Sequence, residues 1–478
     1  MHFYADVNSQ GGYYGNALQA ASVEGHEAVV RLLLENGADV HATGGRFGNA
    51  LNAALLKRHE MVAQLLLDNG ADIDAQSKYH GNTLRVASGE GHVAIVRLLL
   101  ENGADINAQG GYYGNALQAA SVKGHEAVVR LLLENGADVH AQGGHYGNAL
   151  NAALVERHEV VARLLLEKDA HNAQDGGFYI GALEVATGKG LDSMAQLLVK
   201  KCASANVSGS EFGIALYYAS TEGLEATVAM LLERYIDINE RVVIYRSLKA
   251  ASRHGHKGVV RLLLEKGADI IGKAGYGDAL KVASLHDHKA VVWLLLEKGA
   301  HIIGQASYRD ALQAASVRGC EAVVRLLLDK ITDVGTPGGD FYRDALEVAS
   351  GSGSEVVVQL LLDKITAIDT PGGDFYKDAL HAASGWGFEA IVQLLLDKIT
   401  DIDAPGEDFY KGALEAASCW GSEAVVRLIL DKITAVDTPG EDFYTDALEA
   451  ASGRTSKTVI RLLLNRITDV SIRGGDFY

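Results

Sequence analysis

The feature that most constrains this chain is a leucine, usually preceded by alanine, that returns at near-constant intervals. In 478 residues it occurs fourteen times, at intervals of 33, then 32 and finally 34 residues. A period of this length, kept along a whole chain, is typical of stacked repeats that pack only against their neighbours. The sequence therefore predicts one continuous array, not the three domains that its length alone would suggest. We number the repeats 1 to 14 by these key leucines: Leu18, Leu51, Leu84, Leu117, Leu150, Leu183, Leu216, Leu248, Leu280, Leu312, Leu346, Leu380, Leu414 and Leu448.

Each repeat predicts two short helices and a protruding loop. In repeat 1, Asn16 is suited to begin a helix, because its carboxamide accepts a hydrogen bond from a free first-turn N–H. The small apolar segment that follows should end at Gly25, and a second helix should run from Glu27 to Gly37, a residue suited to the left-handed conformation. Residues 38–48 are rich in glycine and predict a finger. The second helix is apolar almost all round, so it is buried only between two neighbours.

The second helix and the corner after it carry the motif G-H-x-x-V-V-x-L-L-L-x-x-G-A-D-V, at residues 25–40 and again at 124–139. In this motif the chain resembles the ankyrin-repeat family, whose unit is a turn and two antiparallel helices. The resemblance implies an all-α solenoid of about fourteen helix–turn–helix repeats with protruding β-turn or hairpin fingers. The family's usual T-P-L-H start is replaced here by N-A-L-Q, so we expect asparagine to cap the first helices. In later repeats we expect the same role for Asp278, Asp310, Asp344, Asp378 and Asp446.

The array is not uniform along its length. Residues 11–75 recur almost verbatim at 110–174, which indicates that a block of three repeats was duplicated. The chain begins and ends inside a finger, so we expect it to be part of a larger protein. We divide it into regular 33-residue repeats at 1–176, degenerate repeats at 177–245, 32-residue repeats at 246–310, and 34-residue repeats with Pro-Gly fingers at 311–478.

Charge and composition exclude several classes of protein. With 61 acidic and 43 basic residues, the net charge of −18 argues against binding to nucleic acid or to anionic membranes. No apolar run approaches the ~18 residues of a membrane span, and the N-terminus does not resemble a secretory signal. Cys202, Cys320 and Cys419 are too far apart in sequence to suggest a disulfide framework or a thiolate metal site. We expect a soluble cytoplasmic or nuclear protein.

Little in the sequence points to catalysis, a cofactor or a metal. Residues 267–274 nearly match a phosphate-binding loop, but Ala274 stands where magnesium needs a hydroxyl, and the segment follows a predicted helix. Histidines such as His59, His92 and His125 recur at the start of the second helix, so we expect them to bond the backbone of a neighbouring repeat. An aromatic residue four positions before most key leucines should likewise pack at the base of each finger. We predict a protein that is not an enzyme and needs no cofactor.

A partner surface is expected where the repeats differ. In the family that the chain resembles, partners bind the fingers and the concave end of the first helix, which lies five and six residues after the key leucine. Arg318, Trp386 and Trp420 occupy this position, and the two tryptophans belong to adjacent repeats. Their side chains should therefore be neighbours, and tryptophan is enriched at binding hot spots. The alternative is that each ring only covers a neighbouring helix.

Acidic residues gather in the same part of the chain. From residue 311 onward there are 27 acidic and 15 basic residues. Rows of one charge would steer a basic partner, although an ordinary solvated face would look the same. The finger acids that we include in the predicted site are Asp340, Asp374, Glu407, Asp408, Glu441 and Asp442.

Together these observations predict a non-catalytic scaffold that binds a partner protein, with a basic surface, on its concave and finger surface. They leave the oligomeric state open. One alternative rests on resemblance: the segment Y-G-N-A-L-Q-A-A-S at residues 14–22 and the block duplication are similar to the sensor halves of fungal NACHT-type NTPase receptors. That resemblance implies a ligand-sensing, autoinhibitory array in a signalling receptor. A second alternative is a structural spacer or adaptor without a discrete hot spot.

Overall fold

In the computed structural model the described residues form an all-α solenoid of fourteen helix pairs, which confirms the predicted fold. It forms two compact units, Met1–Ile236 and Asp237–Tyr478. The structure describes residues 6–474 except 74–75, 78–80, 170–175, 206, 208, 235–240, 300–302, 332–339, 369–372, 401–407, 437–440 and 455, and the side chains of a few further residues also lie outside the description. Among the described residues no helix is both long and apolar enough to cross a bilayer.

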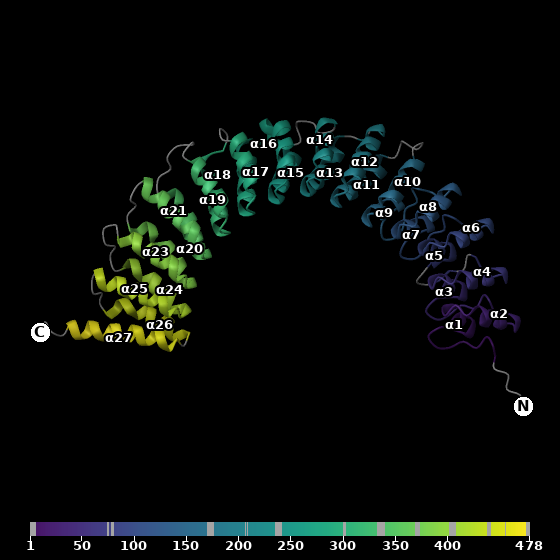
Figure 1. Cartoon of the computed structure of the whole chain (residues 1–478), viewed down its shortest axis with the longest axis horizontal. Helices are drawn as coiled ribbons and strands as arrows, with labels where there is room; N and C mark the ends of the chain where they lie inside the picture. The colour runs from purple at the N-terminus through teal and green to yellow at the C-terminus, as the bar shows by residue number, and fades with distance from the viewer. Residues whose placement is uncertain are drawn as a thin grey trace, which may run out of the picture. The chain divides into compact units, whose positions relative to one another are not determined.

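The described part of the first unit forms seven helix pairs in two layers. Figure 1 shows α3, α5 and α7 side by side in one layer and α4, α6 and α8 in the other. The helices are α1 (Ala17–Val23), α2 (Glu27–Glu35), α3 (Ala50–Leu56), α4 (Glu60–Asp68), α5 (Thr83–Glu90), α6 (Val93–Glu101), α7 (Ala116–Lys123), α8 (Glu126–Glu134), α9 (Ala149–Val155), α10 (Glu159–Lys168), α11 (Gly176–Gly188), α12 (Asp192–Ser204), α13 (Gly213–Glu222) and α14 (Glu225–Arg234), with a short 3-10 turn at Gly209–Phe212.

Asparagine caps and glycine fingers shape the first five repeats, as predicted. The Asn16 side chain accepts a hydrogen bond from the Gln19 amide at 2.8 Å, and Asn49, Asn82, Asn115 and Asn148 cap their helices in the same way. The fingers close through antiparallel bridges such as Gly11 with Gly15, or through strands β1 (Gln76–Ser77) and β2 (Gly81–Asn82). Adjacent fingers touch through their backbones: a Cβ on Gly45 would lie 2.3 Å from the Tyr14 carbonyl oxygen.

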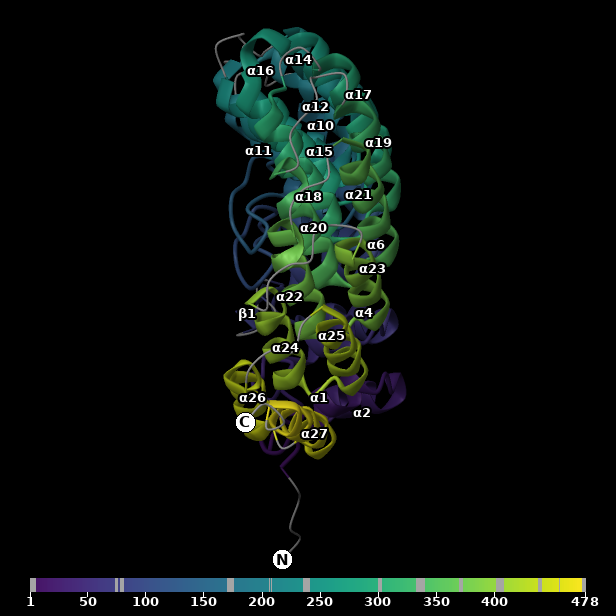
Figure 2. The same cartoon turned by 90° about the vertical axis from the view of Figure 1, so that its left-hand side faces the viewer.

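The residues described in the second unit also form seven helix pairs in two layers. Figure 2 shows α18, α20, α22 and α24 in one row and α19, α21, α23 and α25 in the other. Its elements are α15 (Arg241–His254), α16 (Lys257–Leu285), α17 (Lys289–Gly299), α18 (Gln305–Val317), α19 (Glu321–Ile331), α20 (Asp340–Ser352), α21 (Glu355–Ile368), η4 (Gly373–Tyr376), α22 (Lys377–Trp386), α23 (Glu389–Thr400), α24 (Asp408–Trp420), α25 (Glu423–Val436), η5 (Glu441–Tyr444), α26 (Thr445–Gly453) and α27 (Lys457–Gly474), and α16 is two helices that meet at Gly272.

The predicted aspartate caps of the second unit are wrong, because its first helices begin earlier than expected. Helix α18 begins at Gln305, so Asp310 lies inside it, as Asp278 and Asp344 lie inside α16 and α20. Asp378 and Asp446 lie in the first turn of their helices, after a tyrosine N-cap. The residues before these aspartates include a buried tyrosine, which is preceded by a buried phenylalanine from residue 341 onward. Burial of an apolar face stabilises a helix more than a single cap does.

The aromatic residues before the key leucines are packing residues, as expected. In the second unit they are almost fully buried, and each forms an edge-to-face pair with the phenylalanine before it where one is present, such as Phe375 with Tyr376 at 5.2 Å between ring centroids. In the first unit Tyr14 and Tyr146 are only half-buried, and their hydroxyls donate to Glu24 and Glu156. The rings therefore pack at the junction between each repeat and the next.

Candidate functional site

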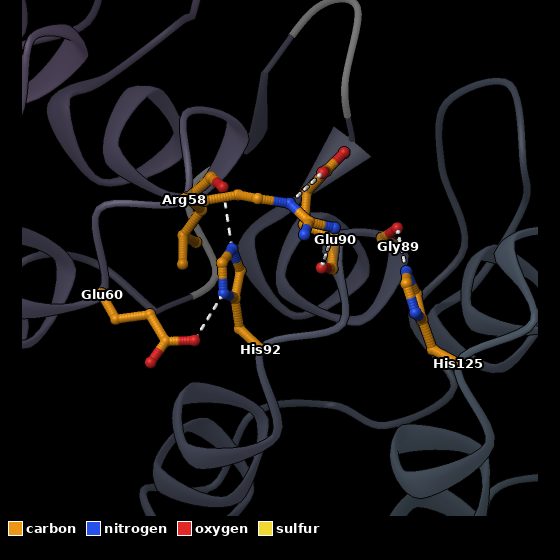
Figure 3. Close-up of polar contacts among 7 residues, drawn as sticks. Arg58, Glu60, Gly89, Glu90, His92 and His125 are labelled. Carbon is orange, nitrogen blue, oxygen red and sulfur yellow. Dashed lines mark hydrogen bonds and ion pairs between the residues drawn. The ribbon is translucent and has the colours of Figure 1, made fainter.

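The recurring histidines bond one repeat to the repeat before it. The Nε2 atom of His125 lies 3.0 Å from the Gly89 carbonyl oxygen, and that of His92 lies 2.9 Å from the Leu55 carbonyl oxygen (Figure 3). His59, His158 and His288 make the same contact at 2.8 to 3.1 Å. This confirms the sequence prediction, and it assigns these histidines to the structure of the array.

The sixth residue after each key leucine lies at the end of each first helix, and these residues together form a row. In the first unit this sixth-position row alternates in charge: Glu24, Lys57, Glu90, Lys123, Glu156, Lys189 and Glu222. The four glutamates and three lysines of this row therefore largely offset each other in charge. In the second unit the row changes to His254, His286, Arg318, Ser352, Trp386, Trp420 and Arg454. The variation expected at this position is therefore concentrated in the second unit.

The two tryptophans of this row stack on each other, which confirms that they are neighbours. The ring centroids of Trp386 and Trp420 are 5.4 Å apart with an interplanar angle of 27°, and the residues are 62% and 56% exposed. The guanidinium of Arg454 lies over the Trp420 ring at 5.3 Å from its centroid. Sequence reasoning missed Arg454, although it holds the same position one repeat later. Arg318 is exposed at the end of α18, two repeats before Trp386.

A groove lies beside this stack, between α24 and α26. It is lined by Glu415 and Cys419 from α24 and by Asp446, Glu449 and Arg454 from the next repeat. Lys411 pairs with Asp446 at 2.9 Å. Glu415 and Glu449 are exposed and form no ion pair in the part of the chain that the structure describes. The groove therefore carries an excess of negative charge next to two exposed rings.

The acids near the stack replace ion pairs found earlier in the unit. Lys249 pairs with Asp278 at 3.6 Å, and Lys281 pairs with Asp310 at 3.8 Å, each across adjacent repeats. The equivalent positions hold Glu347 opposite Asp378. Burial raises the pKa of the Glu347 carboxyl, and the carboxylates of Asp378 and Asp344 raise it further, whereas His381 lowers it.

Two repeats later an acid, Glu415, again holds the position of the lysine, but there Asp446 pairs with Lys411 instead. Like charges therefore face each other at Glu347 and Asp378, whereas Asp446 has a lysine partner on the neighbouring first helix. This pattern was missed from the sequence because the paired positions are 31 residues apart and match only when the repeats are aligned.

Family comparison agrees with the geometry. The model for ankyrin repeats in sets of three matches residues 18–110, 51–143, 84–175 and 311–408, and the model for a single ankyrin repeat matches 248–273. The chain belongs to the ankyrin-repeat family. Ankyrin repeats are generally protein–protein interaction modules and are typically non-catalytic. A search of curated proteins finds no match to this ankyrin array.

The acidic finger residues of the predicted site lie wholly or partly outside the described residues of the later ankyrin repeats. Glu407 lies outside the described residues. The backbones of Asp340, Asp374, Asp408, Glu441 and Asp442 are placed at or near the starts of α20, η4, α24 and η5, but their side chains lie outside the description. The Pro-Gly turns of these fingers also lie outside it.

The thiols and acidic groups of the ankyrin array were compared with the requirements of a metal site. No group of three or more His, Cys, Asp or Glu in that part of the chain could hold a metal ion. Cys202 and Cys320 are buried, and burial raises the pKa of Cys202 to about 12, so its thiol stays protonated at neutral pH.

Proposed function

We propose that this ankyrin array is a non-catalytic scaffold that binds a protein with a basic surface, and that the Trp386–Trp420 stack is the centre of the binding surface. The observation that carries the proposal is the exposure of two stacked tryptophans, 62% and 56%, on the first-helix layer. At this position the other repeats carry charged, polar or histidine side chains. Large aromatic side chains in contact with water are characteristic of interfaces.

Exposure also argues against the alternative that the rings only cover a neighbouring helix. A ring with a purely structural role would be buried, as Tyr376 and Tyr410 are in the same repeats, at 0% and 3% exposed. The core of these repeats is already formed by such residues. The two tryptophans therefore have more surface to bury on a partner than they bury in the chain itself.

Removal of the two rings tests the proposal. The Trp386→Ala/Trp420→Ala variant should lose partner capture in a pull-down at low and high salt, and its helix content and melting temperature should stay close to wild type because the rings are mostly solvated. Trp293→Ala is the matched control: this residue is 43% exposed but belongs to α17, in the second-helix layer. A partner that is captured equally well by the double variant would refute the site.

A second candidate is the sensor array of a NACHT-type receptor. The Y-G-N-A-L-Q-A-A-S segment at residues 14–22 and the block duplication favour it. Under this proposal the array senses a ligand and restrains an NTPase domain encoded in the same gene. Sequencing of the native transcript upstream of Met1 tests it: a phosphate-loop domain in the same reading frame is expected, and a stop codon there would exclude it.

A further inference from the structure

We infer that the ends of the first helices in repeats 8, 9 and 10 bind a phosphorylated serine or threonine side chain of a protein segment. This inference goes beyond the proposed function, because it concerns other side chains and a partner group of the opposite charge. The side chains that carry it are Arg253, His254, His286 and Arg318, which we call the cationic cluster. All four residues are exposed.

The cationic cluster stands in a basic part of an acidic chain. Residues 246–310 contain 11 basic and 6 acidic residues, with five histidines in addition, whereas each of the other three segments of the chain is net acidic. In the sixth-position row, the alternating charges of the first unit are followed here by His254, His286 and Arg318 in succession. Three successive positions of the row can therefore carry positive charge and attract an anion.

Contacts between adjacent repeats place the cationic cluster around His286. Helix α16 ends at this residue and packs against both α15 and α18. The His286 ring stacks on His288 at 6.2 Å between ring centroids, and His288 Nε2 lies 2.8 Å from the Arg253 carbonyl oxygen. Partial burial lowers the pKa of the His286 imidazole, and so do the charges of four neighbours: Arg253, His288, Arg318 and His254. Positive charge from three repeats therefore converges on one imidazole.

The acids on or beside these first helices have other partners. Asp278 and Asp310 each pair with a lysine of the preceding repeat, at 3.6 and 3.8 Å. Burial raises the pKa of the Cys320 thiol, and the charge of Asp287 raises it further, so the Asp287 carboxylate lies beside this thiol. Among the described residues no acidic side chain forms an ion pair with the cationic cluster. Its positive charge is therefore available to a partner.

A phosphate group fits this convergence better than a carboxylate does. Arginine forms two parallel hydrogen bonds with phosphate, and a protonated imidazole donates a further one. A phosphorylated side chain carries a charge of about −1.5 to −2 and three acceptor oxygens, so it engages donors from several repeats at once. A carboxylate has a single charge and two oxygens, and it leaves more of the positive charge of the cluster uncompensated.

Labelled peptides test the chemistry of the partner group. Eleven-residue peptides of Gly and Ala carry a central phosphoserine, serine or aspartate, and their binding to the full chain is measured by fluorescence polarisation at low salt and pH 7.5. The phosphoserine peptide should bind about tenfold more tightly than the aspartate peptide, and the serine peptide most weakly. No binding of the phosphoserine peptide, equal affinity for the phosphoserine and serine peptides, or tighter binding of the aspartate peptide would overturn the inference.

Matched variants separate the cationic cluster from general charge attraction. Arg253→Gln/Arg318→Gln should weaken binding of the phosphoserine peptide about tenfold. Arg261→Gln/Lys298→Gln removes the same net charge from the second-helix layer of repeats 8 and 9, and its affinity should stay within about twofold of wild type. All four residues are exposed, so neither variant should change the melting temperature. Equal losses of affinity in the two variants would overturn the inference.

The affinity should also depend on pH through His286. A bound phosphate opposes the positive charges that lower the pKa of His286, so this imidazole takes up a proton in the complex. The affinity should therefore fall about threefold from pH 7 to pH 8, a range in which the charge of the phosphate itself changes little. The His286→Gln variant should show a weaker dependence. An equal or steeper dependence in that variant would count against the inference.

Discussion

The bond between His125 and the preceding repeat can be measured against a nearly ideal control within the same chain. His125 and His26 are surrounded by nearly identical sequences, because residues 110–140 repeat residues 11–41 with a single difference, Lys123 in place of Glu24. The His125 ring contacts the Gly89 carbonyl oxygen at 3.0 Å (Figure 3). The His26 ring forms no hydrogen bond in the described part of the chain. Substitution of each histidine by alanine therefore removes the same side chain with and without an inter-repeat bond.

The expected loss of stability in His125→Ala follows from the hydrogen bond that is removed and from the Gly89 carbonyl that is left without a partner. A typical hydrogen bond contributes about 0.5–1.5 kcal/mol net, and a buried carbonyl left without a partner costs about 1–3 kcal/mol. No other hydrogen bond to the Gly89 carbonyl is seen among the described residues, and Gly89 is half-buried, so water reaches it in part. We therefore expect His125→Ala to destabilise repeats 3 and 4 by about 1.5 kcal/mol. His26→Ala should cost much less.

Hydrogen exchange measured by mass spectrometry reports this difference repeat by repeat. A loss of about 1.5 kcal/mol should make the amides of α5, α7 and α8 exchange roughly tenfold faster in His125→Ala. Peptides from the duplicated block must include residue 24 or 123 to be assigned. Equal acceleration of the surrounding helices in His26→Ala, or none in His125→Ala, would refute the claim that the bond to Gly89 stabilises the stack.

The same residue predicts a pH dependence. Burial lowers the pKa of His125 in the folded chain, and the bond to Gly89 only partly offsets this effect. The unfolded chain therefore binds the proton first, so the stability that depends on the neutral ring is full above about pH 6.5 and falls as the pH drops through the lowered pKa. On acidification, the protection of the amides around His125, corrected for the intrinsic exchange rate at each pH, should fall more in wild type than in His125→Ala. Identical pH profiles for the two proteins would contradict this assignment.

Two further predictions concern backbone strain and thiol exposure. Gly124 and Gly136 both have positive φ, but only at Gly124 would an added Cβ lie 2.6 Å from the His158 ring. Gly124→Ala should therefore lower the free energy of unfolding by about 1 kcal/mol more than Gly136→Ala does. Equal urea midpoints of the two variants in far-UV circular dichroism would contradict the repeat packing. A chromogenic disulfide reagent at pH 8 should react quickly with Cys419 in the folded chain, and with the buried Cys202 only in denaturant. Rapid modification of Cys202 in the folded chain would refute its burial.

The sequence by itself determined that the chain is built from repeats, the period of these repeats, and the residues that begin and end their helices in the first unit. Period and helical pattern depend on contacts within one unit and with the next, so they can be read directly from the chain. The asparagine cap at Asn16 is local in the same sense, because it involves residues only three positions apart. The histidine bonds and the contact between Trp386 and Trp420 follow once equivalent positions are stacked.

Only the tertiary structure decided where the later helices begin and which side chains meet across repeats. Asp310 was expected to cap a helix, but the helix begins five residues earlier, at Gln305, and its first turns include Tyr308, which is almost fully buried. Arg454 reaches Trp420, and Glu347 faces Asp378, through packing between repeats. A local sequence pattern reflects the conformational preference of a single helix, whereas these contacts depend on how neighbouring helices pack side by side. Burial of side chains between neighbouring repeats outweighs the local preference.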